Sequence, residues 1–173
     1  MHREKFQIKI RVKDLYRFLM YYNYKSIGGV VGVLISVVSL GYLLISFQGN
    51  SNGTNLLLLV VGLLFTVIQP LMLLQKSAMQ ATQNPGFRNP LEYEIGEQGV
   101  VIRQSAEEVS VPWENIVSIV ETKKQILVYT SRVNACIWPK DQFAEQQQGI
   151  KQIIAQYMEP QYCKWHKGEK MEE

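Results

Sequence analysis

Two long apolar runs interrupt a chain whose other apolar residues mostly alternate with polar ones. Residues 27–47 (IGGVVGVLISVVSLGYLLISF) and 56–74 (LLLLVVGLLFTVIQPLMLL) contain no Asp, Glu, Lys or Arg. Because a helix needs about 20 apolar residues to cross a bilayer, both runs predict transmembrane helices. Two buried core helices are the alternative, but the rest of the chain is too short to surround both.

The segment before the first apolar run has a period of two. Apolar residues alternate with polar ones from Phe6 to Val12, which predicts a half-buried strand. A lone strand is not stable in water, so we expect it to join a sheet formed elsewhere in the chain. Asp14 then resembles a helix N-cap, and residues 15–25 have apolar positions at helical spacing, which predicts a juxtamembrane helix.

From Leu91 the period of two returns in six short runs that are separated by turn residues. This pattern favours a meandering antiparallel sheet, to which Phe6–Val12 would add a seventh strand. A helix from about Asp141 to Met158 should cover the sheet, although Gly149 weakens it and the residues before Gly149 could form a separate turn. The six predicted strands are Leu91–Ile95, Val100–Gln104, Val109–Pro112, Val117–Lys123, Gln125–Ser131 and Ala135–Trp138.

These elements divide the chain into five segments. Within the linker, the first half could extend the second apolar helix before Asn84-Pro85-Gly86 breaks it, and Asn52-Gly53 predicts a tight turn between the two spans. The segments are a cytosolic strand and basic helix (1–26), a transmembrane hairpin (27–74) with an extracellular loop (48–55), a linker (75–90), an α+β domain (91–158) and a polar tail (159–173).

The distribution of charge predicts an orientation in the membrane. Residues 1–26 have a net charge of +5, Lys76 follows the second apolar run, and the loop 48–55 has no charge. Cationic flanks remain in the cytosol, so we expect a multi-pass protein of the cell membrane with both termini cytosolic. The two cysteines provide no disulfide framework, and two reduced thiols suit the cytosol.

The basic residues also predict contact with anionic lipid. For the lysine pair at a hairpin tip, simple solvation is the alternative. The basic residues of segment 1–26 lie beside the predicted membrane helix, which argues against nucleic acid as a partner. The candidate lipid contacts are Lys9, Arg11, Lys13, Arg17, Lys25, Lys123 and Lys124.

Small residues recur in the two apolar runs. Gly28, Gly32 and Ser36 are spaced by four, and Gly62 lies in the second run, so helix backbones can approach closely along these positions. Packing of the two spans into a hairpin is one interpretation, and homodimerisation through the same stripe is the other. Gln69 is the only strongly polar residue, so we expect no transport path, and Gln69-Pro70 predicts a kink.

After the hairpin, four motifs occur in order: LEYEI-GEQGVVI, VPWENI, VETKKQILVY and IWPKDQF. Together they resemble the YcxB-like family of bacterial membrane proteins, from Leu91 to about Tyr157. The resemblance implies a pleckstrin-homology-like (PH-like) curved antiparallel sheet of six or seven strands capped by a C-terminal helix. It implies almost no chemistry.

The most specific residues of these motifs have a structural interpretation. Proline ends a strand, and a tryptophan at a sheet corner buries a large apolar surface. We therefore interpret both motifs as corners, with ligand contact by Trp113 as the alternative. The corner residues are Pro112, Trp113, Ile116, Pro139, Lys140 and Phe143.

Candidate catalytic residues are few. Glu114, Lys140 and Asp141 could exchange protons, but their spacing does not bring them together. Cys163 and His166 are too few to form a zinc site. We therefore expect no catalytic, cofactor or metal site, and no enzyme. The sequence favours a membrane protein that presents an interaction domain to an unknown protein partner, with homo-oligomerisation as an option; a lipid- or signal-sensing regulator is the alternative.

Overall fold

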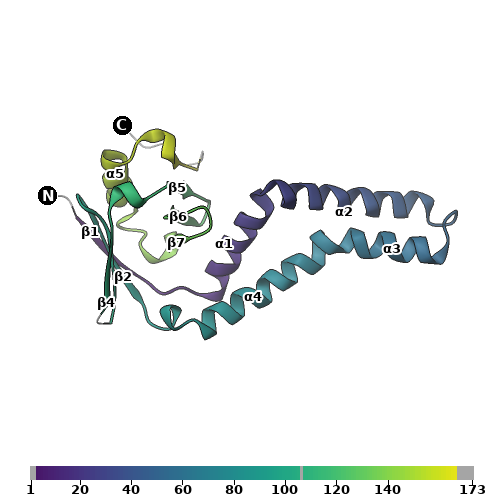
Figure 1. Cartoon of the computed structure of the whole chain (residues 1–173), viewed down its shortest axis with the longest axis horizontal. Coiled ribbons are helices and arrows are strands. Elements are labelled where there is room, and N and C mark those ends of the chain that lie inside the picture. Colours follow the sequence, from purple (N-terminus) through teal and green to yellow (C-terminus); the bar gives the residue numbers. More distant parts are fainter. Residues whose placement is uncertain (1–2, 106, 167–173) are drawn as a thin grey trace. The chain divides into compact units, whose positions relative to one another are not determined.

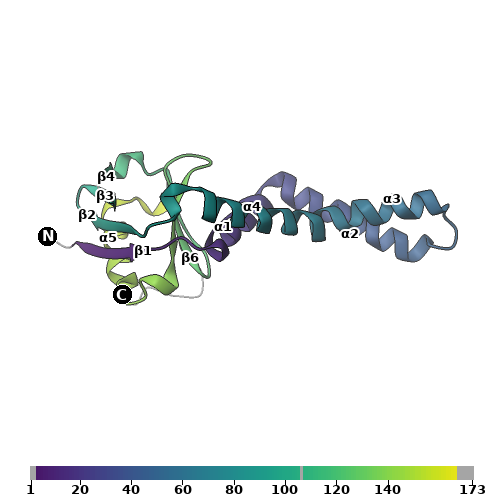
Figure 2. The same cartoon turned by 90° about the horizontal axis from the view of Figure 1, so that it is seen from below.

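The computed structural model describes residues 3–105 and 107–166, and it divides into two units (Figures 1 and 2). The sheet domain contains the chain up to Asp14 and again from Ala81, and the helical unit is Leu15–Gln80. Of the predicted polar tail, 159–173, only the part up to His166 lies within the described residues.

The helical unit contains the two apolar runs. The second run forms one continuous helix that includes a π-helical turn. Its N-cap is Ser51, whose side chain accepts a hydrogen bond from the Thr54 amide, so the tight turn predicted at Asn52-Gly53 is wrong and both residues open the helix. The elements are α1 (Val12–Lys25), α2 (Ile27–Ser46), α3 (Asn52–Leu63), the π-helical turn (Leu64–Ile68) and α4 (Gln69–Gln83).

Both apolar helices are long and apolar enough to cross a membrane. Within the described part of the chain, Ile27, Leu44 and Ile45 remain 85%, 82% and 87% exposed. Large apolar side chains exposed in this way are typical of a surface that contacts another protein or a membrane.

Small residues make the contact between α2 and α3, which lie side by side in Figure 1. A Cβ atom on Gly32 would overlap the Phe65 ring, and one on Gly62 would overlap Leu40. Ser36 donates a hydrogen bond to the Val61 carbonyl at 3.0 Å. Gly28 does not contribute to this contact, because outside its own helix no described atom lies within 4 Å of a Cβ built there; its role in homodimerisation stays a prediction.

The π-helical turn explains how the helix accommodates Pro70. The Gln69 amide donates to the Leu64 carbonyl, five residues back. In the same register the Phe65 carbonyl would face the amide of Pro70, which has no hydrogen to donate. The Tyr24 hydroxyl donates to that carbonyl instead, at 2.5 Å. The irregularity expected at Gln69-Pro70 therefore lies in the turn just before it.

The strands form two four-stranded sheets, so the prediction of a single sheet is wrong. Sheet A has the order β1-β2-β3-β4 and sheet B has the order β7-β6-β5-β8. Each is antiparallel except for the parallel pair of β5 and β8. The strands are β1 (Glu4–Ile8), β2 (Leu91–Gly96), β3 (Gly99–Gln104), β4 (Glu107–Val111), β5 (Ser118–Glu121), β6 (Gln125–Tyr129), β7 (Ala135–Pro139) and β8 (Cys163–Lys164).

The N-terminal strand joins sheet A, which confirms that it pairs across the gap containing both apolar runs. Its register with β2 runs from Glu4 opposite Ile95 to Ile8 opposite Leu91. The predicted bounds are wrong at the C-terminal end, because Val12 already begins α1. Ile10 stays buried without belonging to a strand, so its apolar character reflects burial rather than sheet pairing.

The VPWENI corner separates the two sheets. Pro112 precedes the 3₁₀ turn Trp113–Asn115. This turn lies between β4 in sheet A and β5 in sheet B. The Trp113 indole donates to the carbonyls of Gly96 and Glu97 at 3.0 and 3.1 Å and stacks on Tyr157 at 5.7 Å. Trp113 thus joins the corner to the turn between β2 and β3 and to the final helix.

Helix α5 (Gln147–Tyr157) starts later than expected. Residues 140–142 form a separate 3₁₀ turn, so the predicted helix start near Asp141 is wrong. The buried face of α5 carries Ile150, Ile153 and Ile154. Gly149 lies inside the helix, where a Cβ atom would overlap the Glu4 carboxylate. The glycine that weakens the helix therefore permits a close approach of β1.

Candidate functional site

The candidate site is the N-terminal arm, which we define as residues 3–14, together with the residues of the sheet domain that it contacts. Phe6 is the one aromatic residue of the arm, and it is buried. Its ring lies 5.5 Å from Tyr93, 5.2 Å from Trp138 and 5.1 Å from Phe143. Tyr93 and Trp138 belong to different sheets, and Trp138 and Phe143 are at most 1% exposed. The arm is therefore part of the core between the sheets.

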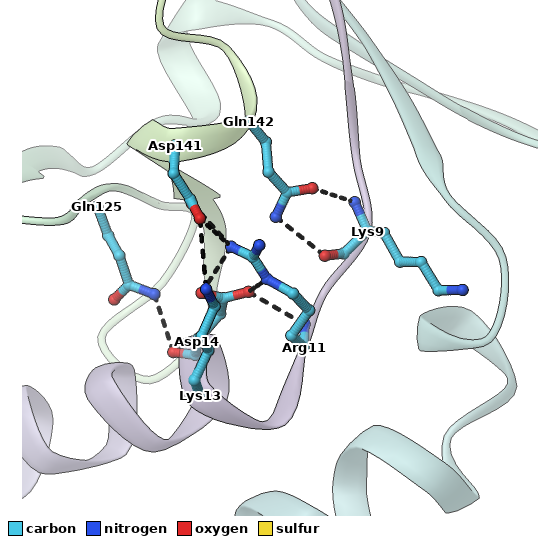
Figure 3. Close-up of polar contacts among 7 residues, drawn as sticks. All are labelled: Lys9, Arg11, Lys13, Asp14, Gln125, Asp141 and Gln142. Carbon is cyan, nitrogen blue, oxygen red and sulfur yellow. Dashed lines mark hydrogen bonds and ion pairs between the residues drawn. The ribbon is translucent and has the colours of Figure 1, made fainter.

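Two amides hold the arm beyond β1 (Figure 3). Gln142 accepts a hydrogen bond from the Lys9 amide at 2.8 Å and donates one to the Lys9 carbonyl at 3.1 Å. The buried Gln125 side chain donates to the Asp14 carbonyl at 2.9 Å. Both glutamines satisfy backbone groups that no strand reaches, so the arm is fixed up to the start of α1.

Arg11 is the centre of the polar cluster in Figure 3. One of its terminal nitrogens lies 2.7 and 2.8 Å from the two carboxylate oxygens of Asp141, and its Nε lies 2.7 Å from Asp14. Lys13 lies 3.4 Å from Asp141. Charge-assisted contacts of this kind are stronger than neutral hydrogen bonds. Arg11 thereby joins the first turn of α1 to the 3₁₀ turn after β7.

Asp14 does not cap α1 in the predicted way. The helix starts at Val12, and the Asp14 carboxylate reaches back to the Arg11 amide at 3.2 Å. This is the reciprocal half of a capping box, in which the third helical residue satisfies the amide of the N-cap residue. The carboxylate is fully buried, which is tolerated because Arg11 pairs with it.

The charges of the cluster stabilise one another. Hydrogen bonds that Arg11 donates to Asp14 and then to Asp141 raise the pKa of Arg11 above its ordinary value. The hydrogen bond from Arg11 is the main cause that lowers the pKa of Asp141 below 3.8, and Lys13 adds to the effect. These shifts favour the charged forms of both Arg11 and Asp141.

The predicted lipid contacts have different surroundings. The charges of Arg11 and Lys13 are compensated within the sheet domain, and Lys25 contacts the Tyr21 ring. The Lys9 side chain points away from the cluster in Figure 3 and is exposed. Lys123 and Lys124 are exposed at the tip between β5 and β6, and Arg17 is exposed but not without a partner. The structure thus reduces the positive charge that the arm can offer to a membrane.

The three side chains considered for acid–base chemistry point to different partners. Glu114 is exposed in the corner turn. Lys140 lies 2.5 Å from Glu121, and Asp141 binds Arg11. Among residues 3–105 and 107–166, no group of three or more His, Cys, Asp or Glu side chains could hold a metal ion.

A second charge cluster, around Glu121, was not predicted from the sequence. Glu121 is buried, and its Oε1 lies 2.5 Å from Lys140 and 2.7 Å from Lys151. Its other carboxylate oxygen accepts the His166 amide at 3.1 Å. Burial alone would raise the pKa of Glu121, but these partners lower it below its ordinary value. The available signal was a charged residue two positions after Ile119, on the inward face of its strand.

The predicted corner residues lie where the chain turns. Pro112, Trp113 and Ile116 surround the turn between the sheets, and the Ile116 amide donates to the Trp113 carbonyl at 3.0 Å. Pro139 is the last residue of β7, and Phe143 is 1% exposed in the core. The Lys140 amide donates to the Lys124 carbonyl at 3.0 Å.

Comparison with known proteins supports the family resemblance over part of the chain. Residues 95–154 match the family model described as YcxB-like protein, which confirms the resemblance for that stretch. The matched segment runs from the end of β2 into α5 and includes both corners. No curated protein and no solved structure matches the chain.

Proposed function

We propose that the chain is a non-enzymatic membrane protein with two transmembrane spans, which holds a cytosolic interaction domain against the membrane. Its role is that of an adaptor or assembly protein. The sheet domain is proposed to be PH-like, because a meander of short strands in two sheets is followed by one helix with a single buried face.

The pairing of β1 with β2 is the observation that carries this proposal. The two strands flank the apolar helices in sequence, and five residue pairs join them. Strands can pair only on the same side of a membrane. If Ile27–Ser46 crosses a bilayer, the helix Asn52–Gln83 must therefore cross back. An even number of spans then follows from the sheet itself.

The charges favour the cytosolic side for the sheet domain. Cationic residues precede the first apolar helix and Lys76 lies in α4, whereas the five residues 47–51 between the helices are uncharged. This asymmetry predicts that residues 47–51 cross the membrane and that the arm does not.

The fixed arm supports a role in presentation rather than in signalling by a loose tether. The sheet domain receives the chain twice, through the arm before the hairpin and through the end of α4 after it. A domain with two chain connections to its anchor loses more orientational freedom than a domain on one linker. Val109, Val117 and Val133 are more than half exposed on this domain and are candidate positions for partner contact.

Topology is tested with reporters fused at Asn52 and after residue 173. The proposal expects a periplasm-active reporter to work only at Asn52 and a cytosol-active reporter only at the C terminus. Equal behaviour at both sites, or release of the full chain from membranes at alkaline pH, contradicts it.

Partner binding is tested by placing a photo-crosslinking amino acid at Val109, Val117 or Val133 in living cells. The proposal expects a discrete crosslinked species at one or more of these positions. Glu97, which is exposed in the turn between β2 and β3, is the matched control position. If all three positions give only the background seen at Glu97, these valines are not the interaction surface.

A further inference from the structure

One edge of sheet B is held by an unusually short strand. The strap, which we define as residues 163–166, contains β8, and β8 pairs in parallel with β5 through Ile119–Cys163 and Val120–Lys164 only. In the described part of the chain, the other strand pairs have four or five residue pairs each and are antiparallel. Parallel pairing is also slightly weaker per residue. The strap is thus the strand with the weakest backbone hold.

Side-chain contacts next to the edge of β5 nevertheless add to the binding of the strap. The His166 amide donates to the buried Glu121 carboxylate at 3.1 Å. The Trp165 ring covers the Lys151 ammonium at 5.9 Å. The side chains of Glu121 and Lys151 are only 1% and 10% exposed. The edge therefore fits an extended segment in which two ladder residues are followed by an aromatic residue and then by a backbone amide that donates to Glu121.

The connection to the strap allows it to take another path. Helix α5 ends at Tyr157, and Met158 is buried. The next four residues, 159–162, are all exposed and contain a short 3₁₀ turn. Redirecting the strap therefore changes the backbone of exposed residues and leaves the core of the sheet domain intact.

We propose that the edge of β5 is a strand-binding site that accepts either the strap of its own chain or the strap of a second copy. The two straps have the same sequence, so the exchange replaces each contact by an identical one. If the function proposed above is correct, anchoring of both copies in one membrane raises the effective concentration of the second strap. The exchange gives a closed dimer, because each copy donates one strap and accepts one.

The register of β5 and β8 provides a direct test with full-length chains. Two differently tagged chains are co-expressed, both carrying Cys136→Ala. The acceptor chain has Ile119→Cys and Cys163→Ser, and the donor chain keeps Ile119 and Cys163. Neighbouring strands bring paired Cα atoms within the range that a disulfide spans. Mild oxidation therefore links the two tags when the donor strap lies on the acceptor edge.

Two controls make each outcome decisive. A single chain with Ile119→Cys and native Cys163 should form an internal disulfide, which shows that the strap reaches the edge. An acceptor with Glu97→Cys in place of Ile119→Cys reports random collisions, since Glu97 is exposed in the turn between β2 and β3, which belong to the other sheet.

We expect the acceptor–donor disulfide to exceed the Glu97→Cys background by about tenfold. An internal link in the single chain, with the mixed pair at background, refutes exchange between copies. Absence of both links shows that the strap does not bind this edge and refutes the proposal as well. The topology reporters are independent of these disulfides, so failure of either proposal is recognised separately.

Discussion

Arg11 joins parts of the sheet domain that are far apart in the sequence. It contacts Asp14 within its own turn and Asp141 at a separation of 130 residues. An arginine with two carboxylate partners positions the backbone that carries it, because its planar group donates in fixed directions. Arg11 therefore holds the end of the arm against the 3₁₀ turn at residues 140–142.

Removing the charge of Asp141 should loosen the arm. Asp141→Asn keeps the shape of the side chain but loses the ion pair, and we expect a loss of about 0.5–1 kcal/mol in the free energy of unfolding, since Asp141 is half exposed. Faster amide hydrogen exchange in β1 is the more specific readout. Glu114→Gln is the matched control, because this acid is exposed in the 3₁₀ turn Trp113–Asn115. Equal exchange in both variants would refute the role of Arg11.

The Tyr24 hydroxyl replaces the amide hydrogen that Pro70 lacks. Tyr24→Phe leaves the Phe65 carbonyl without this donor, and we expect a loss of about 1–2 kcal/mol in the stability of the helical unit. Thermal unfolding in detergent measures the loss. Tyr22→Phe is the control, because Tyr22 is 42% exposed. If the two variants unfold at the same temperature, water or lipid donates to the Phe65 carbonyl instead.

At the scale of elements, two glycines set the distance between α2 and the helix formed by α3 and the π-helical turn. Gly32→Val and Gly62→Val should each separate the helices, because a larger side chain overlaps Phe65 or Leu40. Overpacking of this kind typically costs about 1–3 kcal/mol. Gly28→Val and Gly41→Val place the same side chain where no described atom lies within 4 Å outside the helix, and should be nearly neutral. A disulfide-trapping assay across the hairpin compares the four variants, and equal trapping contradicts the packing.

The elements that sequence patterns predicted are those defined by local periodicity. The short runs of β-branched and other apolar residues in VVIRQ and QILVYTS, bounded by turn residues, identified β3 and β6, and the long apolar runs identified both long helices. The separation into two sheets was not predicted, because whether β5 pairs with β4 depends on the direction in which Pro112 and Trp113 turn the chain. Strand β8 has two residues, which is too short for any periodicity.

The candidate site was less predictable than the fold. Arg11, Asp141 and Gln142 all occur in polar stretches, and their partners are determined by topology rather than by spacing. Gln125 was read only as the start of a strand, yet its side chain is buried against the Asp14 carbonyl. Only Glu121, a charge at an inward position of a strand, had a local signal.

For the whole molecule, lowered carboxylate pKa values predict sensitivity to acid. Asp141, Glu94 and Glu121 all have folded-state pKa values below their ordinary values of 3.8, 4.5 and 4.5, with cationic partners lowering each. Stability from these groups is complete above the ordinary values and is lost as the pH falls through the lowered ones. We expect the sheet domain to lose stability below about pH 4.5.

Tryptophan fluorescence during denaturant unfolding at several pH values measures this dependence. Glu121→Gln should reduce the slope between pH 5 and pH 3 and also lower stability at neutral pH, because Lys140 and Lys151 then face a neutral group. Stability that is constant from pH 7 to pH 3 would show that these carboxylates do not contribute as described.

The ladder between β1 and β2 has a consequence for biosynthesis. The ribosome makes Glu4–Ile8 first, and its partner Leu91–Gly96 emerges only after both apolar helices have been translated. Until then Phe6 and Ile8 have no core to enter. If both helices cross a membrane as proposed, a nascent chain that inserted only one of them would leave the two strands in different compartments and sheet A incomplete. Completion of sheet A would then distinguish correctly inserted chains from those that quality-control proteases should remove.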